Sequence, residues 1–206
     1  MSQQDRKSGL FNDRSDRPDL YYTAFGLACA AALGLKLENT DNISRSLSGI
    51  GKDALDLVHL KAFIQTENML KLLAVPGFMR KTVLEYASVG AGAETKNTLV
   101  NLLKNAPDSA FPNADRNSPY SLFLGITAYQ DCALKTDVFE DAVSTLDSYR
   151  AADHPYAYSN MRGGAVSLNP TLAAIHVKRI FSLKIADETV DFLRGSQLAD
   201  GGFKAS

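Results

Sequence analysis

Apolar residues recur three and four positions apart in several segments of the chain, which is the spacing of one face of an α-helix. No stretch alternates apolar and polar residues for long enough to predict a strand. The pattern therefore predicts an all-α chain. The predicted helical segments are Ala24, Leu27, Ala28 and Ala31, then residues 53–64, 97–104, 122–133, 138–149, 172–181 and 189–194.

Segments rich in Gly, Pro, Ser, Asn and Asp separate these helices. They cover residues 8–18, 106–119 and 153–170, and we expect them to form the turns between helices. The longest apolar stretch, residues 24–35, is well short of the roughly 20 residues that cross a bilayer. It therefore predicts a buried helix and no membrane span.

An internal repeat is visible in the sequence. Asp19 opens Asp-Leu-Tyr-Tyr-Thr-Ala-Phe, and Asn117, 98 positions later, opens the similar Asn-Ser-Pro-Tyr-Ser-Leu-Phe. A step of half that distance, 49, leads from Asp19 to Asn68, and a step of 52 leads from Asn117 to Asn169. Asp and Asn are good helix N-caps, so the four positions predict the starts of inner helices in about four stacked hairpins.

The two ends of the chain carry a related motif. Gly9-Leu10-Phe11 precedes the first predicted inner helix, and Gly201-Gly202-Phe203 stands where it would precede another. Because a repeat array needs a terminal unit to cover its apolar face, we expect one domain over residues 1–206. That domain is either a fragment of a longer array or is closed by a protein partner or a second copy.

Composition narrows the function classes. With 22 basic and 23 acidic residues, the net charge of −1 does not suit a nucleic-acid-binding surface. The N-terminal residues have no apolar core of a signal peptide, which favours a cytoplasmic protein. Cys29 and Cys132 lie in apolar helical segments, so both are predicted to be buried free thiols.

Two stretches resemble a known family. Residues 192–203 contain Gln-Leu-Ala-Asp-Gly-Gly-Phe, and residues 17–25 read Arg-Pro-Asp-Leu-Tyr-Tyr-Thr-Ala-Phe. Both are similar to the prenyltransferase and squalene-oxidase repeat of protein prenyltransferase β-subunits and terpene cyclases, whereas residues 38–105 match poorly. The resemblance implies an α/α-toroid around an apolar funnel. It implies that the funnel is lined by Tyr21, Tyr22, Phe25, Tyr120, Phe123 and Thr171.

The catalytic positions of that family are changed here. Its zinc ligands are Asp, Cys and His, because the metal must deprotonate and orient a thiol. The resemblance places the Asp-x-Cys pair at Asn117 and Pro119 and the His at Tyr22. None of these side chains suits zinc, so we expect no metal, no cofactor and no zinc-dependent catalysis.

Other polar residues give weaker candidates. The cyclase branch uses an Asp-x-Asp-Asp run, which this chain lacks. His59 follows Asp56 by three residues and is predicted to pair with it on a helix, while His154 and His176 are isolated. A diphosphate would need clustered cations, for which Arg162, Lys178 and Arg179 are the candidates, although a solvated face explains them better.

Three functions remain open at this stage. The chain is a non-catalytic module that binds an apolar, isoprenoid-like ligand or a protein partner, which we favour. Alternatively, it belongs to an active prenyltransferase-like or cyclase-like enzyme whose catalytic groups lie outside it. The third alternative is a structural helical-repeat protein with a filled centre.

Overall fold

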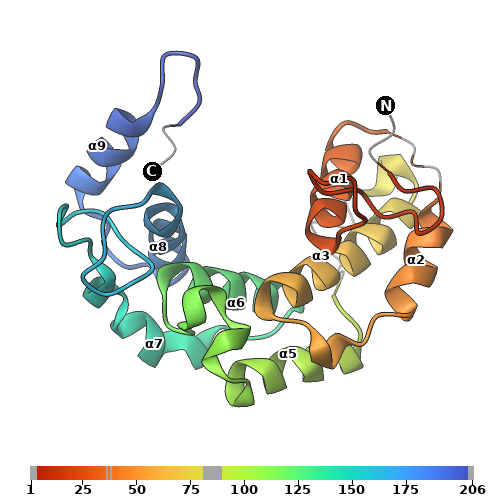
Figure 1. The fold of residues 1–206 in the computed structure, drawn as a ribbon, viewed down its shortest axis with the longest axis horizontal. Coiled ribbons are helices and arrows are strands. Elements are labelled where there is room, and N and C mark those ends of the chain that lie inside the picture. The colour runs from red at the N-terminus through yellow and green to blue at the C-terminus, as the bar shows by residue number, and fades with distance from the viewer. Residues whose placement is uncertain (1–3, 36, 38, 81–89, 204–206) are drawn as a thin grey trace. The chain divides into compact units, whose positions relative to one another are not determined.

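The computed structural model describes residues 4–35, 37, 39–80 and 90–203 (Figure 1). This part of the chain is helical and contains isolated β-bridges but no strand, so the all-α prediction is confirmed. The closure of the hairpins into a toroid stays a prediction. The elements are α1 (Leu20–Ala32), α2 (Thr40–Ser48), η1 (Lys52–Ala54), α3 (Leu57–Ala74), α5 (Ala93–Asn105), η2 (Asp108–Ala110), η3 (Pro112–Ala114), α6 (Pro119–Asp131), η4 (Asp137–Phe139), α7 (Glu140–Ser144), η5 (Leu146–Tyr149), α8 (Leu168–Ile180) and α9 (Asp187–Ser196).

The chain divides into two compact units. Unit 1 comprises Met1–Asn105 and Ala128–Leu134, and unit 2 comprises Ala106–Thr127 and Lys135–Ser206. Helix α6 therefore begins in unit 2 and ends in unit 1.

Unit 1 is built around α1 and α3, which pack against each other. Asp19 caps α1 by accepting a hydrogen bond from the Tyr22 amide (2.9 Å), so this predicted helix start is confirmed. Asp56 caps α3 in the same way. The helices are held by burial of their apolar faces. One buried cluster of this unit consists of Leu10, Leu20, Ala24, Leu27, Ile43, Leu47, Ala62 and Phe63.

The prediction of a helix start at Asn68 is wrong. Asn68 lies in the interior of α3, which runs from Leu57 to Ala74 without a break. The reason is local, because no Gly or Pro interrupts the segment between Asp56 and Pro76. The side chain of Asn68 donates instead to the carbonyl of Asp131 (2.7 Å) and so satisfies a free carbonyl at the end of α6.

Helix α2 is the one α-helix of the described part that the hydrophobic pattern did not predict. It has few apolar residues, and only Ile43 and Leu47 are buried. These two residues are four apart and pack on the α1–α3 core. A nine-residue segment with one apolar pair gives too little periodicity to be recognised from sequence.

Helices α1, α6 and α8 are copies of one another at fixed intervals. Each has 13 residues, and they begin at residues 20, 119 and 168, so the intervals are 99 and 49. The residues before these starts are Asp19, Ser118 and Ser167. The predicted starts at Asn117 and Asn169 are therefore wrong by one and two residues, because the hydroxyl residues Ser118 and Ser167 stand at the helix entry.

The same three helices also end alike. A residue with positive φ follows each one: Gly34 (65°), Ala133 (53°) and Ser182 (53°). The leucine after it donates its amide back to a carbonyl inside the helix over 2.8–2.9 Å. This is the Schellman arrangement, which satisfies carbonyls that the helix leaves free. The sequence signal is Leu-Lys at 35–36, 134–135 and 183–184.

The two cysteines differ in exposure. Cys132 is buried as predicted, but Cys29 is exposed, so the prediction for Cys29 is wrong. The buried face of α1 is formed by Leu20, Ala24 and Leu27, and Cys29 lies on its other side. Apolar residues occur on every side of α1, so hydropathy alone does not predict which side packs against the rest of the unit.

Candidate functional site

A loop in unit 1 is fastened to the start of α1. Gln4 and Phe11 form a β-bridge, and between them lies Gly9 with φ of 74°. The Phe11 amide donates to the hydroxyl of Thr23 (2.9 Å), and the Asp19 amide donates to the Phe11 carbonyl (2.9 Å). We call this pair of hydrogen bonds between an aromatic residue and the first turn of the next helix the clasp.

Unit 2 repeats the clasp at the start of α8. Arg150 and Tyr158 form the β-bridge. The Tyr158 amide donates to the Thr171 hydroxyl (2.9 Å), and the Ser167 amide donates to the Tyr158 carbonyl (3.1 Å). The Thr171 hydroxyl in turn donates to the Ser167 carbonyl (2.7 Å), as Thr23 does to Asp19 (2.6 Å). Two far-apart segments of the sequence thus make the same local structure.

A third bridged turn follows α9. Gln197 and Phe203 form the bridge, and Gly201 has φ of 85°. The predicted likeness of Gly9-Leu10-Phe11 and Gly201-Gly202-Phe203 therefore extends to their backbone geometry. Phe203 is exposed.

The aromatic residues predicted on α1 form a cluster on its exposed side. Tyr21 contacts Phe25 edge to face with ring centres 4.8 Å apart, and Tyr22 lies 6.0 Å from Tyr21. All three are exposed, and Phe25 is the most exposed at 54%. Helix α1 contains no charged residue. This face is consequently exposed and largely apolar.

A second cluster in unit 2 joins α6 to α8. Tyr120 stacks on Phe123 (6.1 Å), and His176 meets Phe123 edge to face (5.1 Å). Leu172, one helical turn before His176, is also exposed. Phe123 is thus the centre of an apolar face that two helices share.

Thr171 was predicted to line the same funnel, but it is fully buried. Its hydroxyl is occupied by the clasp. The structure therefore gives Thr171 a role in holding the loop on α8.

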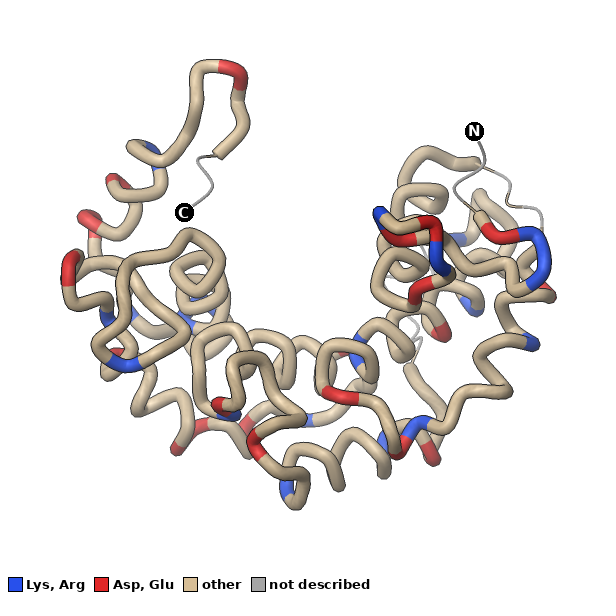
Figure 2. Tube along the Cα trace, viewed as in Figure 1, with Lys and Arg blue, Asp and Glu red and all other residues tan. Residues whose placement is uncertain are grey.

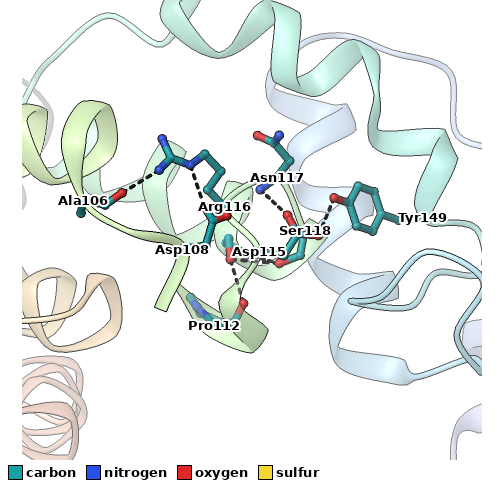
Figure 3. Close-up of polar contacts among 9 residues, drawn as sticks. Ala106, Asp108, Pro112, Asp115, Arg116, Asn117, Ser118 and Tyr149 are labelled. Carbon is teal, nitrogen blue, oxygen red and sulfur yellow. Dashed lines mark hydrogen bonds and ion pairs between the residues drawn. The ribbon is translucent and has the colours of Figure 1, made fainter. Parts of the chain in front are cut away.

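Asn117 and Pro119, onto which the resemblance places the Asp-x-Cys pair, lie at the start of α6, and hydrogen bonds fix the loop that precedes it (Figure 3). The Asp115 carboxylate accepts from the Asn117 amide (2.9 Å) and from the Tyr149 hydroxyl (2.7 Å). Burial first, and then this carboxylate, raise the pKa of Tyr149, so the phenol stays a neutral donor. Arg116 donates to the Ala106 carbonyl (2.6 Å). These bonds fix the loop that precedes α6.

Two of the three cations considered for a diphosphate have other partners. Lys178 is buried and pairs with Asp147 (2.8 Å), and the Arg162 guanidinium lies over the Tyr149 ring (5.1 Å). Arg179 is exposed on α8. Figure 2 shows basic and acidic residues interspersed along the chain, with long uncharged stretches in α1, α6 and α8.

Asp147 is the centre of a polar network in unit 2. Its carboxylate accepts from the Tyr158 hydroxyl (2.6 Å) and Lys178, and Arg150 lies 3.4 Å away. Burial alone would raise the pKa of Asp147, but the hydrogen bonds from Lys178 and Tyr158 outweigh burial and lower it. Burial and the same carboxylate raise the pKa of Tyr158.

A pair of titratable side chains of opposite charge lies in unit 1, between α3 and the end of α6. Lys61 Nζ is 3.6 Å from Asp131 Oδ2. Burial lowers the pKa of Lys61 and raises that of Asp131. Burial also raises the pKa of the neighbouring Cys132 to about 11, so its thiol is a poor nucleophile near neutral pH.

The histidines do not combine into a metal centre in the described part of the chain. His59 pairs with Asp56 (2.7 Å) in a half-exposed contact, as predicted. His154 packs on Phe192 with ring centres 4.9 Å apart. Across residues 4–35, 37, 39–80 and 90–203, no group of three His, Cys, Asp or Glu side chains could hold a metal ion.

Unit 1 also contains a hollow of about 300 Å³ that the sequence did not predict. The residues that flank this lining in the sequence, 36, 38 and 81–89, lie outside the described part, so we assign no ligand to it. Its lining consists of Leu35, Leu37, Thr40, Asp41, Ser44, Leu70, Leu73, Ala74 and Arg80.

Within the described ranges, no helix combines the length and the apolar character that a membrane crossing requires. Comparisons with protein-family models, with curated proteins and with solved structures gave no match.

Proposed function

We propose that the chain is a helical-repeat binding module that takes an apolar, isoprenoid-like ligand on the partly exposed aromatic face that α6 and α8 share around Phe123. The observation that carries this proposal is the cluster around Phe123, which Tyr120 and His176 contact from two different helices. Aromatic rings bury a large apolar area with few rotatable bonds, and they suit a flat contact with an unsaturated hydrocarbon chain.

The charge distribution supports an apolar ligand over a charged one. Helices α1, α6 and α8 carry charge only in the last turns of α6 and α8, at Asp131, Lys178 and Arg179. Lys178 is already paired with Asp147. We therefore expect binding to depend on the hydrocarbon tail more than on a diphosphate group.

Catalysis by zinc-dependent thiol alkylation is not part of this proposal. Tyr22, Asn117 and Pro119 stand at the positions where the resemblance places the ligands, and none of them is a zinc ligand. Cys29 is exposed on α1, and Cys132 is buried directly after the end of α6.

Native mass spectrometry of the purified chain with farnesol, farnesyl diphosphate and zinc tests the proposal. We expect farnesol and farnesyl diphosphate to bind with similar affinity and without zinc. Phe123→Ala should weaken both by about tenfold, because a buried aromatic contact contributes on the order of 1–2 kcal/mol.

Phe78→Ala is the matched control, because Phe78 is 85% exposed and lies outside both aromatic clusters. This variant should bind as the unchanged chain does. Zinc-dependent binding of the diphosphate alone would contradict the proposal and would favour an enzyme with unconventional ligands. Equal binding by Phe123→Ala and Phe78→Ala would also contradict it.

A further inference from the structure

The face that α6 and α8 share becomes polar one helical turn beyond Phe123. The two helices begin at residues 119 and 168, which are 49 apart, and the same 49 residues separate Phe123 from Leu172 and Thr127 from His176. The two members of each pair therefore stand at equivalent positions of the two helices. The first pair is apolar, and the second carries a hydroxyl and an imidazole, so both helices change from apolar to polar at the same step.

His176 is the polar residue that touches the centre of this face. Its ring meets the Phe123 ring edge to face, with ring centres 5.1 Å apart and planes at 89°. His176 is exposed, and Leu172, one turn before it on α8, is 41% exposed. A ligand that covers the Phe123 ring and Leu172 therefore also lies against the imidazole.

The ring nitrogens of His176 are free to bind a ligand atom. In unit 1, His59 differs from it, because its Nδ1 lies 2.7 Å from the Asp56 carboxylate. Within the ranges that the structure describes, the His176 ring contacts Phe123 and has no hydrogen-bond partner. Imidazole carries an N–H donor in either protonation state. One oxygen atom of a ligand can thus accept from His176 without displacing a partner in the chain.

The surroundings of His176 favour an uncharged oxygen over an anion. Lys178 is buried and pairs with Asp147 (2.8 Å). Arg179 stands in the last turn of α8, where a basic side chain also complements the helix dipole. On α6, the Thr127 hydroxyl is neutral and donates to the Phe123 carbonyl (2.7 Å). Strong binding of an anion uses several charged donors, whereas one imidazole at the edge of an apolar face suits a single neutral oxygen.

We propose that His176 binds the terminal oxygen of an isoprenoid alcohol whose hydrocarbon chain lies on Phe123 and Leu172. The imidazole N–H donates to the alcohol oxygen, and the carbon chain covers the aromatic ring. This inference rests on the proposed function, because it assigns the polar end of the same ligand. The face thus selects an isoprenoid with a neutral oxygen at its end over the plain hydrocarbon.

Competition between an alcohol and a hydrocarbon of similar carbon skeleton tests the proposal. Radiolabelled farnesol is bound to the full chain in equilibrium dialysis and displaced by unlabelled farnesol or by farnesene. His176→Phe keeps an aromatic ring beside Phe123 but removes the donor. This variant should weaken farnesol by about three- to tenfold, because one neutral hydrogen bond is lost, and should change farnesene by less than about twofold. The hydrophobicity of the two ligands cancels in this comparison of chains.

Arg179→Gln is the matched control, because Arg179 is exposed on the same helix three residues after His176. This variant should leave both affinities within about twofold of those of the unchanged chain. Circular dichroism of the His176→Phe chain should match the unchanged chain, because His176 is exposed. A loss of farnesol affinity in Arg179→Gln as large as in His176→Phe would assign the polar end to Arg179 and overturn the proposal.

The remaining outcomes separate this inference from the proposed function. Equal weakening of farnesol and farnesene by His176→Phe would show that His176 only holds Phe123 in place, and it would overturn the hydrogen bond to the ligand. An unchanged farnesol affinity in His176→Phe would do the same. In both cases the ligand still binds the face, so the proposed function stands. Failure of both ligands to bind the unchanged chain contradicts the proposed function and this inference together.

Discussion

The buried hydroxyl of Thr171 connects the loop at Tyr158 to the start of α8. It accepts from the Tyr158 amide and donates to the Ser167 carbonyl, and it has no exposed surface. The same atoms of Thr23 do the same for Phe11 and Asp19. A buried amide without an acceptor is unfavourable, so the residue at this position decides whether the loop stays on the helix.

Thr171→Val should therefore lower the free energy of unfolding by about 1–3 kcal/mol, because the shape is kept but the Tyr158 amide loses its acceptor. Urea unfolding followed by circular dichroism measures the change. Thr127→Val is the matched control, since the Thr127 hydroxyl bonds only to carbonyls of its own helix, at Phe123 and Leu124. Its effect should stay below about 0.5 kcal/mol. Equal losses for both variants would contradict a special role for Thr171.

Residue-level prediction from the sequence succeeded where local chemistry was sufficient. Asp19 was recognised as a helix cap because a carboxylate before an apolar helix is a strong local signal. Thr171 was assigned to a ligand pocket, because nothing in the sequence shows that the Tyr158 amide, 13 residues earlier, reaches its hydroxyl. The repetition of an aromatic residue followed after 12 or 13 positions by Thr was the signal that could have revealed the clasp.

At the scale of elements, the three matching helices differ in the residue that adopts the left-handed conformation at their C-terminal ends. The left-handed residue after the helix is Gly in one copy, Ala in the second and Ser in the third. Only glycine adopts this conformation without steric strain, and other residues lose about 1 kcal/mol there. The structure therefore contains strain at Ala133 and Ser182 that it lacks at Gly34.

Ser182→Gly should raise the free energy of unfolding by about 0.5–1 kcal/mol, because it removes the strained conformation. Gly34→Ala should lower the free energy by about 1 kcal/mol. No atom lies within 4 Å of the added Cβ at Gly34, so the strain alone is measured. Ser182→Ala serves as a control for the hydroxyl and should have little effect. If Ser182→Gly lowers stability in urea unfolding, the assigned strain at this position is wrong.

The Asp147 network connects η5, the bridged turn and α8, and its strength should depend on pH. The pKa of Asp147 in the folded chain lies below its ordinary value of 3.8. The unfolded chain therefore binds this proton first as pH falls, and the stabilisation is present above about pH 5 and decreases below pH 3.8.

Asp147→Asn should lower the free energy of unfolding at pH 7 by about 1 kcal/mol, a modest value because the carboxylate is half exposed. The difference between the two chains should shrink as the pH falls from 5 towards 3. Urea unfolding at several pH values measures it. A difference that stays constant over this range would show that the charge of Asp147 contributes nothing.

Which elements exist was largely predictable, but how they pair was not. The segments 97–104, 122–133 and 172–181 each correspond to a helix, since their apolar period is sustained. Asn68 misled the repeat assignment because a 49-residue step falls inside α3, whose length the sequence does not interrupt. The face of α1 that packs on α3 could not be told from a helix that is apolar all round.

On the scale of the whole molecule, the division into two units suggests that they open separately. Each unit has its own clasp, and α6 is the helix that they share. In such arrays stability is a sum of local terms, so damage to one unit is felt only partly by the next.

The rate at which Cys132 reacts with a thiol reagent in low urea should report the opening of unit 1, because its side chain is buried. Gly26→Ala should accelerate this reaction by about tenfold or more, since the new Cβ would meet the Phe11 ring at 2.7 Å. Thr171→Val, in unit 2, should accelerate it much less. Exposed Cys29 provides the internal reference and should react rapidly in every variant. Equal acceleration by both variants would show that the units open together.

Helix α6 also limits where such a chain can be cut and joined. Its first residues belong to one unit and its last residues to the other, so a break within 119–131 leaves neither unit intact. The positive-φ residues at 34, 133 and 182 occur at the same step of each copy. Recombination between these equivalent positions adds or deletes 49, 99 or 148 residues and joins one helix end to another at the same step. The turn that ends each of these three helices is thus the natural crossover point for lengthening or shortening the chain.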